Sequence, residues 1–291
     1  MKKWFLCLLA LCITSTSVVI AQSEKTMKRK VAVGRFINET QYTKNPFFNP
    51  DNDPIPKQAM DILSAQLVAS GMFLVQERND LEELVAKGGA DMQKVGADYI
   101  ILGTVKKLGR KVDGDPNIFA QTKTQVEEAN VSIRLVEVST GTVIYSGEAS
   151  GYADSTSKQI LGIGGVIGYD ATLSDKAISA ALSKLVENIM NKCKEKPWRG
   201  YVLAIEEGSY MISGGKSQGI EPGDTFVLYK KGKMVTNPQN GTKVEMPGTS
   251  IGKLTVIMCL GDTPESEVSF CSYEGQDIDA GQLDQYYIME K

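Results

Sequence analysis

The sequence contains no histidine among its 291 residues. This absence excludes Ser-His-Asp and Cys-His catalysis, imidazole-ligated metal sites, and the most common general base at neutral pH. The charge is also nearly balanced, with 32 lysines and arginines against 35 aspartates and glutamates and a formal net charge of −3. So small a charge gives no electrostatic basis for binding a polyanion. The sequence therefore predicts no common hydrolase and no nucleic-acid partner.

Long hydrophobic runs are scarce, and the only candidate lies at the N-terminus. A basic start is followed by an apolar run from Trp4 to Ile13, a polar patch from Thr14 to Ser17, and Ala21 at a position that signal peptidase reads. A transmembrane helix needs about 20 apolar residues, and the polar patch interrupts the run. We therefore predict that residues 1–21 form a cleaved signal peptide and that the chain is exported. A retained N-terminal anchor is the alternative.

Cysteines are few, five in all, and two of them precede the predicted cleavage site. Lipid attachment at Cys12 is an open alternative to cleavage. The mature chain keeps Cys193, Cys259 and Cys271, an odd number for an exported protein. Because Cys259 and Cys271 are equally distant from Glu265, a hairpin centred on Glu265 would place them opposite each other. We predict a disulfide between them, and the alternative is a pair of buried thiols.

The hydrophobic patterns change type near residue 194. Up to that point short strands alternate with segments of helical spacing, among them residues 57–70 and 173–192. Beyond it, only short alternating runs separated by glycine and proline occur. The length also suits two domains. We therefore predict an α/β domain over residues 22–194 and a small all-β domain over residues 199–291.

Two glycine-rich segments look catalytic but lack the required context. Residues 215–219 match the G-x-S-x-G pattern without a partner histidine, and residues 214–217 resemble the end of a phosphate loop whose first glycine is replaced by Tyr210. An enzyme would rest only on generic carboxylates such as Glu127 and Glu128, which suit a solvated strand end. We predict no catalytic residue, no metal, no cofactor and no small-molecule substrate.

Several segments, taken in order, resemble the curli secretion channel family, known as CsgG-type. They are Val31–Thr40, Ser70–Leu81, Gly96–Gly103 and Val131–Gly141, and the resemblance covers about residues 30–192. It implies a three-layer α/β periplasmic domain that assembles into a ring. Each subunit would add two β-hairpins to one shared outer-membrane barrel. Unfolded protein subunits would pass through the ring without any hydrolytic step.

The resemblance also implies a constriction in the loop that follows the first strand. In that family a ring of Tyr, Asn and Phe side chains narrows the channel, and the comparable loop here contains Tyr42, Phe47, Phe48 and Asn49. Adjacent aromatic residues on a free surface would bury nothing, whereas around a ring they could contact a passing chain loosely. The alternative is that Phe47 and Phe48 pack beneath the loop onto the helix that starts at Lys57.

Two segments, residues 106–128 and 151–173, are candidates for the membrane hairpins. A membrane β-strand needs about 9 to 11 residues with one apolar and one polar face. The apolar positions that alternate in this way are Ile118, Ala120 and Val126 in the first segment and Ile163, Ile167 and Tyr169 in the second. The partner strands near residues 106–112 and 151–159 are more polar. The alternative is a pair of hairpins on a soluble surface.

The tail resembles the small C-terminal β domain of the flagellar assembly protein FlgT, through Gly219–Val227 and Ile251–Val256. Such modules bind or space partners. Together the resemblances imply a ring-forming component in the outer membrane or periplasm of a diderm bacterium, whose partners are further copies, secreted protein subunits and periplasmic accessory proteins. The alternative is a soluble periplasmic scaffold of the same fold that binds partners and forms no pore.

Overall fold

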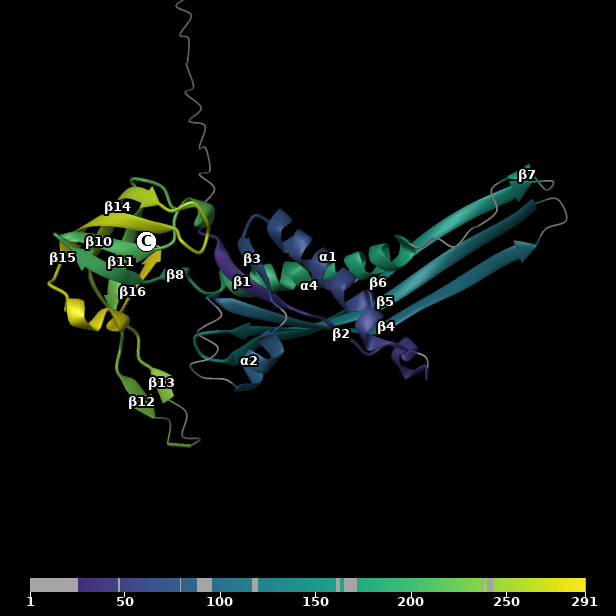
Figure 1. The fold of residues 1–291 in the computed structure, drawn as a ribbon, viewed down its shortest axis with the longest axis horizontal. Coiled ribbons are helices and arrows are strands. Elements are labelled where there is room, and N and C mark those ends of the chain that lie inside the picture. Colours follow the sequence, from purple (N-terminus) through teal and green to yellow (C-terminus); the bar gives the residue numbers. More distant parts are fainter. Residues whose placement is uncertain are drawn as a thin grey trace, which may run out of the picture.

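The chain is a mixed α/β protein with two large β-sheets. Its structure, a computed structural model, describes residues 26–46, 48–78, 80–87, 96–116, 120–160, 163–164, 172–236, 238–239 and 243–290. Figure 1 places the longest axis horizontally, with the first sheet and its helices in the middle and on the right and the second sheet on the left. The strands of the first sheet therefore span much of the length of the molecule.

The first sheet has seven strands in the order β3-β1-β4-β5-β6-β7, with β2 also paired to β4. β1 runs parallel to β3 and β4, whereas the pairs from β4 to β7 are antiparallel. β1 is buried on both faces, as expected for a central parallel strand. The strands are β1 (Arg29–Gly34), β2 (Ile37–Asn38), β3 (Phe73–Arg78), β4 (Tyr99–Pro116), β5 (Ala120–Glu137), β6 (Thr142–Ile160) and β7 (Ile163–Gly164).

Helices cover both faces of this sheet and produce three layers. α1 (Ile55–Ala69) and α4 (Thr172–Lys194) pack on one face, and the short α2 (Leu81–Lys87) packs on the other (Figure 1). In α1 the buried Ala59, Leu63 and Leu67 recur every four residues, which gives the helix one apolar stripe toward the sheet. The opposite face has a smaller core of Ala32, Leu81, Ile100, Leu102, Val136 and Val138.

Three strands are much longer than the sequence pattern suggests. The pattern predicts separate strands over residues 98–105 and 106–112, but β4 runs continuously, with a register shift between Val105 and Lys107. β5 and β6 likewise join segments that look separate in the sequence. The reason is that hydrophobic periodicity reports burial, whereas backbone pairing continues after the side chains become polar.

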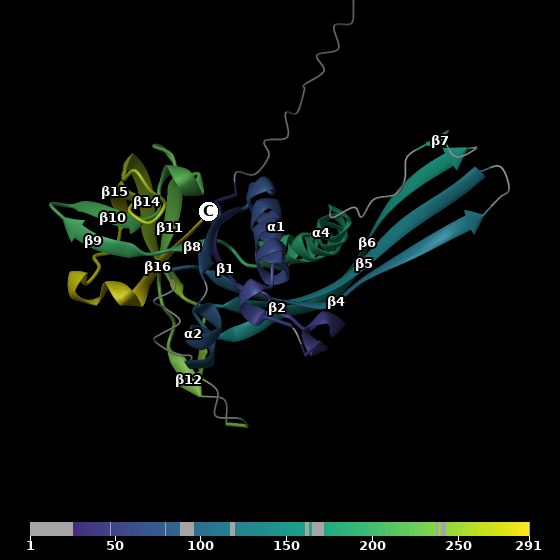
Figure 2. The same ribbon diagram turned by 45° about the vertical axis from the view of Figure 1, so that its right-hand side comes forward.

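The outer halves of these strands form a projection that we call the arm. It consists of residues 106–116 of β4, 120–129 of β5 and 150–160 of β6. Figure 2 shows the three strands leaving the helical layer together. β4 and β5 form the first expected hairpin, and β6 supplies the first strand of the second, of whose return strand only β7 is described.

The second sheet closes on itself to form a small barrel. Its order is β8-β16-β11-β14-β15-β10-β9, and the two end strands, β8 and β9, are separated in the chain only by Tyr201. Closure leaves few open strand edges. The interior contains Ile212, Phe226, Leu254 and Ile288. The strands are β8 (Arg199–Gly200), β9 (Val202–Glu206), β10 (Ser209–Ser213), β11 (Thr225–Lys230), β14 (Thr249–Leu260), β15 (Val268–Gly275) and β16 (Tyr286–Glu290).

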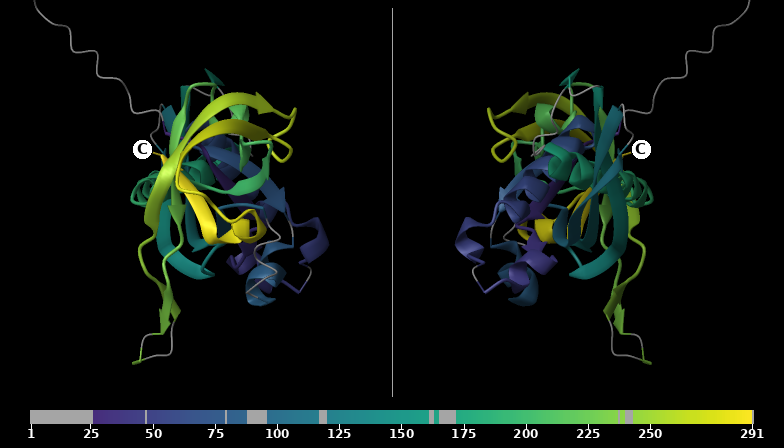
Figure 3. Two further views of the ribbon diagram at one scale, coloured as in Figure 1. Left: turned by 90° about the vertical axis from the view of Figure 1, so that its left-hand side faces the viewer. Right: turned by 90° about the vertical axis from the view of Figure 1, so that its right-hand side faces the viewer.

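A separate hairpin of β12 (Met234–Thr236) and β13 (Lys243–Glu245) extends from the barrel. We call residues 231–247 the finger. It projects across the long axis of the molecule, as the two views of Figure 3 show. Short 3-10 helices complete the described fold: η1 (Gln41–Lys44), η2 (Pro50–Asn52), η3 (Lys216–Gln218) and η4 (Ala280–Gln285).

The segment before β1 connects the barrel to the first sheet. Met27 is buried in the barrel core with Trp198, and its backbone N–H donates to Glu290 Oε1 at 2.6 Å. The next strand begins with Arg29, whose Nη2 donates to the carbonyl oxygen of Lys196 at 2.5 Å. The two sheets are therefore joined by contacts at the start of the described chain as well as by the connection after α4.

Candidate functional site: the arm and its root

The arm has an unpaired strand edge on each side in the part of the chain that the structure describes. β4 pairs with β1 at residues 99–101 and with β2 at residues 104–105, so residues 106–116 bond only to β5. β6 pairs with β5 along its length and reaches β7 only through Gln159 and Ile160. Unpaired rows of N–H and C=O groups are templates for another strand.

The arm face turned away from α1 and α4 is polar near the helical layer. Lys107 Nζ lies 2.6 Å from Glu128 Oε2, and Tyr152 donates to Glu128 Oε1 at 3.4 Å. In the strand register, Val126 lies between Lys111 and Asp154. Exposed charges of this kind stay hydrated and add little to stability. This part of the face therefore suits water or a polar partner.

The opposite face of the arm contacts α4 at very close range. Leu108, Ala129 and Gly151 lie in one row across β4, β5 and β6. A β-carbon at Gly151 would lie 2.1 Å from the carbonyl oxygen of Ala177 and 2.3 Å from the amide nitrogen of Ala181. The α4 backbone therefore rests directly on β6, and only glycine leaves room for it.

The next row contains a buried ion pair. Arg110 is directly opposite Glu127 in the β4–β5 register. Its Nε lies 2.5 Å from Glu127 Oε2, with the two side chains only 13% and 4% exposed. Arg110 Nη1 also donates to Gln125 at 3.2 Å. Two buried charges are tolerated when their geometry satisfies both. We call Arg110, Glu127 and Gly151 the arm root, because they lie where the strands leave the helical layer.

The sequence interpretation of Glu127 as a solvated carboxylate is wrong. Its neighbour Glu128 is also acidic, and nothing in the local sequence distinguishes the two residues. Alternation along β5 places Glu128 on the open face and Glu127 on the face toward α4. Its partner Arg110 lies 17 residues away in the chain. Only knowledge of the β4–β5 register could have identified this pair in advance.

The loop from residue 38 to 56 is tied together at its two ends. Asn38 Nδ2 donates to Asp53 Oδ2 at 2.8 Å, and Asp53 Oδ1 accepts from the N–H of Ile55 at 3.1 Å. The N–H of Glu39 donates to the carbonyl oxygen of Val105 at 2.9 Å. The loop therefore begins beside β4 at the start of the arm.

The structure places three of the four predicted constriction residues. Tyr42 in η1 is 47% exposed. Phe48 is half-buried, and Asn49 is exposed, with a side chain that accepts from the N–H of Asp51 at the start of η2. Phe47 lies outside the described residues. The exposed Tyr42 and Asn49 are available for contacts outside this subunit, whereas Phe48 is partly covered by its own chain.

Five of the six predicted membrane-facing side chains lie outside the description. Ile118, Ile167 and Tyr169 are outside the described residues, and the side chains of Ala120 and Ile163 are outside the description as well. Among these positions only Val126 has a described side chain, which is half-buried. These assignments stay predictions.

The expected pairing of Cys259 with Cys271 is wrong. Cys259 lies opposite Ser269, because the hairpin is centred on Pro264 rather than on Glu265, and a bulge at Ile257 then places Cys271 opposite Val256. Cys193, Cys259 and Cys271 are all free thiols. Cys271 points into the barrel core, and Cys193 lies in the core between α4 and the first sheet. Burial raises the pKa of both the Cys193 and the Cys271 thiol to about 12.

These buried thiols should make the protein sensitive to alkali. The ordinary thiol pKa is 9.0, so above pH 9 the unfolded chain loses protons that folded Cys193 and Cys271 retain. Burial also raises the pKa of Tyr99 to about 12, with the same sign. Stability should therefore fall as the pH rises above 9. Urea unfolding between pH 7 and 11 tests this, and Cys193→Ala should flatten the decline. A pH-independent midpoint would contradict it.

The glycine-rich segment that resembles a phosphate loop already holds an anion from its own chain. The backbone N–H of Ser217 donates to the two Glu267 carboxylate oxygens at 2.9 and 3.1 Å, and the Ser217 hydroxyl donates to the same group at 2.9 Å. The carbonyl oxygen of Glu267 accepts from the N–H of Gly214. This arrangement fixes a turn in the barrel beside η3.

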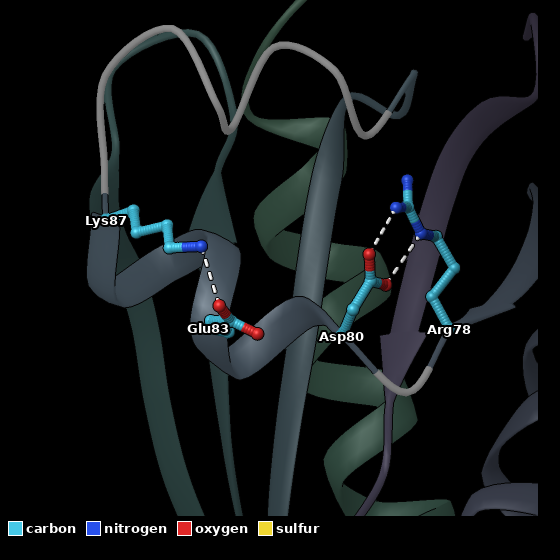
Figure 4. A network of polar contacts seen from close by, with 4 residues as sticks. All are labelled: Arg78, Asp80, Glu83 and Lys87. Carbon is cyan, nitrogen blue, oxygen red and sulfur yellow. Dashed lines mark hydrogen bonds and ion pairs between the residues drawn. The ribbon is translucent and has the colours of Figure 1, made fainter.

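The charged residues around α2 form local contacts rather than a catalytic cluster. Arg78 donates twice to Asp80, at 3.0 and 2.6 Å, and Lys87 contacts Glu83 one helical turn away at 2.6 Å (Figure 4). The hydrogen bond from Arg78 lowers the pKa of Asp80. Both pairs are exposed and brace the two ends of a short helix. Within the described ranges, no group of three metal-ligating side chains occurs.

No helix among the described residues is long and apolar enough to cross a membrane. A family model, described as "Curli production assembly/transport component CsgG", matches residues 14–222. The match includes the first sheet, its helices and the arm. This chain belongs to the CsgG family. The predicted resemblance is thereby confirmed, and the family is one of assembly and transport components.

Three further proteins are similar to this CsgG family chain. "Putative lipoprotein NMB1126/NMB1164" of Neisseria meningitidis serogroup B is 30% identical over 179 residues, which are 60% of this chain and 80% of that protein. The PelC dodecamer of Paraburkholderia phytofirmans is 19% identical, with a TM-score of 0.31 over 55% of this chain and 86% of PelC. Lipoprotein GNA1162 of N. meningitidis is 18% identical, with a TM-score of 0.26 over 58% of this chain and 99% of that lipoprotein.

Proposed function

We propose that this protein is a ring-forming secretion component of curli type in the envelope of a diderm bacterium, through which unfolded protein subunits pass without hydrolysis. The observation that carries the proposal is the arm, in which β4 and, among the described residues, all of the arm part of β6 before Gln159 have no strand on their outer side. Membership of a family of assembly and transport components supports the secretion role. The lipoprotein description of the neisserial relative supports a location in the envelope.

The unpaired edges require neighbours if the arm enters lipid. Backbone groups in the bilayer core must all be hydrogen-bonded, so an open sheet cannot cross it alone. Here the edges lie on opposite sides of one arm. Their pairing is head-to-tail, and a head-to-tail contact generates a ring when the rotation closes. Copies of this chain therefore supply the edge partners, and their arms together form one barrel.

The part of the arm that contacts lipid lies toward its tip. Near the root, the Lys107–Glu128 pair and Tyr152 keep one face hydrated, and Lys111 and Asp154 flank Val126. Charged groups facing lipid are costly at the bilayer midplane. Val126 therefore lies at the boundary between the hydrated part of the arm and the part that contacts lipid. With Val126 at this boundary, the membrane-facing positions that we propose are Ile118, Ala120, Ile163, Ile167 and Tyr169.

The same polar faces favour the second candidate function, a soluble periplasmic scaffold whose arms pair with partner proteins. Bilayer conductance separates the two. The mature protein should need detergent and should raise the conductance of a bilayer. In the control variant the first hairpin ends at residues 110 and 127 and the second at residues 154 and 172. This variant should be soluble without detergent and should not raise conductance. The free energy of unfolding of the shortened variant should equal that of the intact protein, which shows that the remaining fold is intact. If the intact protein is a water-soluble monomer, the channel proposal is wrong.

We also propose that the loop at residues 38–56 narrows the channel. Phe47 and Phe48 are the leading constriction residues, and the exposed Tyr42 and Asn49 are secondary. Changing both phenylalanines to Ala should increase conductance and preserve thermal stability. Packing against α1 would instead cost about 3 to 5 kcal/mol for a fully buried Phe. Lost stability with unchanged conductance would refute the assignment.

Finally, we propose that residues 22–194 and 199–291 are two domains, and that the second resembles the C-terminal β domain of FlgT and binds accessory proteins. The separate buried clusters of the first sheet and of the barrel support the division. The contacts of Met27 with the barrel keep the domains together. Limited proteolysis should cut between residues 194 and 199 or within the finger before it cuts either core.

A further inference from the structure

The finger exposes apolar side chains that its own hairpin cannot bury. Met234, Val235, Val244 and Met246 are between 44 and 56% exposed. β12 and β13 pair with each other and with no other strand among the described residues, and each has three residues. An isolated two-stranded hairpin is marginal in water. These side chains therefore have the character of an unoccupied contact surface.

The direction of the finger is fixed at its base. A β-carbon at Gly232 would lie 2.0 Å from the carbonyl oxygen of Met246. The two backbone segments at the base of the finger therefore approach each other as closely as glycine permits. The N–H of Met246 donates to the carbonyl oxygen of Lys233 at 3.0 Å, and the N–H of Lys231 donates to that of Gln285 at 2.8 Å. The finger is therefore held out from the barrel rather than lying along it.

The finger is also basic, although the whole chain has a net charge of −3. Lys230, Lys231 and Lys233 are exposed at its base, and Glu245 is the single acidic residue of β13. A partner that fits the finger therefore offers an apolar surface with an acidic rim.

A surface of this kind lies on the outside of the barrel. Met258, Phe270 and Met211 form a row across β14, β15 and β10. Bulges at Ile257 and Leu203 turn two more apolar side chains outward. Ile257, Met258 and Leu260 are 47 to 54% exposed. We call this surface the barrel patch; its members are Leu203, Met211, Ile257, Met258, Leu260 and Phe270.

The rim of the barrel patch is acidic. Glu206 and Glu207 lie shortly after Leu203 in the chain, at the end of β9. Asp262 and Glu265 lie shortly after Leu260, at the end of β14. All four are exposed. The rim therefore has the charge that complements the lysines of the finger.

We propose that the finger of one copy packs on the barrel patch of a neighbouring copy. The finger joins the barrel at Lys230 and at Thr249, the start of β14, whereas Ile257, Met258 and Leu260 lie at the other end of that strand. It points away from the barrel, so it does not reach its own patch (Figures 1 and 2). The barrel and the arm lie at opposite ends of the long axis, which places the finger far from a bilayer that contains the arm (Figure 1). A second copy is therefore the partner. The contact is head-to-tail, so it is compatible with a ring.

Photo-crosslinking tests this contact directly. A benzophenone residue at Val235 in the full mature protein, prepared as a mixture of heavy-isotope and light copies, should link to peptides containing Met258 or Phe270 and should yield heavy–light adducts. The same residue at the exposed Glu187 on α4 is the matched control and should yield none to that surface. Adducts confined to one copy, or formed with lipid or another protein, would overturn the proposal.

A charge test keeps the proposal open to refutation without crosslinking. Val235→Glu adds a charge at an exposed position and should weaken self-association about tenfold. Combining it with Met258→Lys should restore association, because the two new charges attract. Equal association in all variants, measured by mass photometry, would contradict the contact.

The proposal shares with the proposed ring only the requirement for several copies. Conductance without heavy–light adducts would refute this contact alone, and adducts without conductance would refute the pore alone.

Discussion

Replacing Glu127 with leucine should destabilise the protein by about 3 to 5 kcal/mol, because it leaves the Arg110 guanidinium buried without its carboxylate. The neighbouring Glu128→Leu is a matched control, since its partner Lys107 is more than half exposed and loses little when unpaired. The free energy of unfolding in urea measures both effects.

A double variant identifies the cause of the loss. Arg110→Met together with Glu127→Leu removes both charges and should recover most of the stability, since an apolar pair can replace a buried ion pair without penalty. If Glu127→Leu is as mild as Glu128→Leu, or if the double variant is the least stable of the three, the ion pair does not fix the arm root.

The second large effect is expected at Gly151, where any β-carbon would collide with the α4 backbone at Ala177 and Ala181. Backbone atoms cannot rotate away as a side-chain end can. Gly151→Val should therefore cost about 3 kcal/mol or more, through displacement of α4 from β6. The melting temperature and the urea midpoint should both fall.

Gly109 is the matched control for this prediction. It lies on β4 of the same sheet, one residue before Arg110, and a β-carbon there would meet nothing within 4 Å. Gly109→Ala should leave the protein as stable or slightly more stable, because alanine loses less backbone entropy in a strand. Equal melting temperatures for the two variants would show that α4 does not rest on β6 as described.

Both predictions concern the direction of the arm. The Arg110–Glu127 pair and the contact at Gly151 lie in adjacent rows on the face of the sheet that α4 covers. Beyond them, the described strands continue without a helix against them (Figure 2). A variant that loosens the arm root should therefore also reduce the proposed edge pairing between copies, even though the sequence of the strand edges is unchanged.

Much of the central fold could be predicted from the sequence. The apolar stripes at residues 57–70 and 173–192 correspond to α1 and α4 within two residues at each end. The strand-forming runs near residues 31 and 99 correspond to β1 and β4. Local periodicity identifies these elements because each buries one defined face. The ordered segments were also sufficient to identify the family.

The features that depend on pairing between distant strands could not be predicted. Glu127 could not be distinguished from Glu128 without the β4–β5 register, and a turn centred one residue earlier, on Pro264, places Ser269 rather than Cys271 opposite Cys259. Closure of the barrel depends on the two-residue strand β8. A single extra residue reverses which face a side chain occupies, and no local signal in the sequence marks it.

The direct test of the ring is electron microscopy of the purified mature protein in detergent, with the particle mass determined on the same sample. We expect closed rings whose mass is a whole multiple of one chain, with the arms of adjacent copies side by side at one end and the barrels at the other. Particles of a single chain, both with and without detergent, would contradict it.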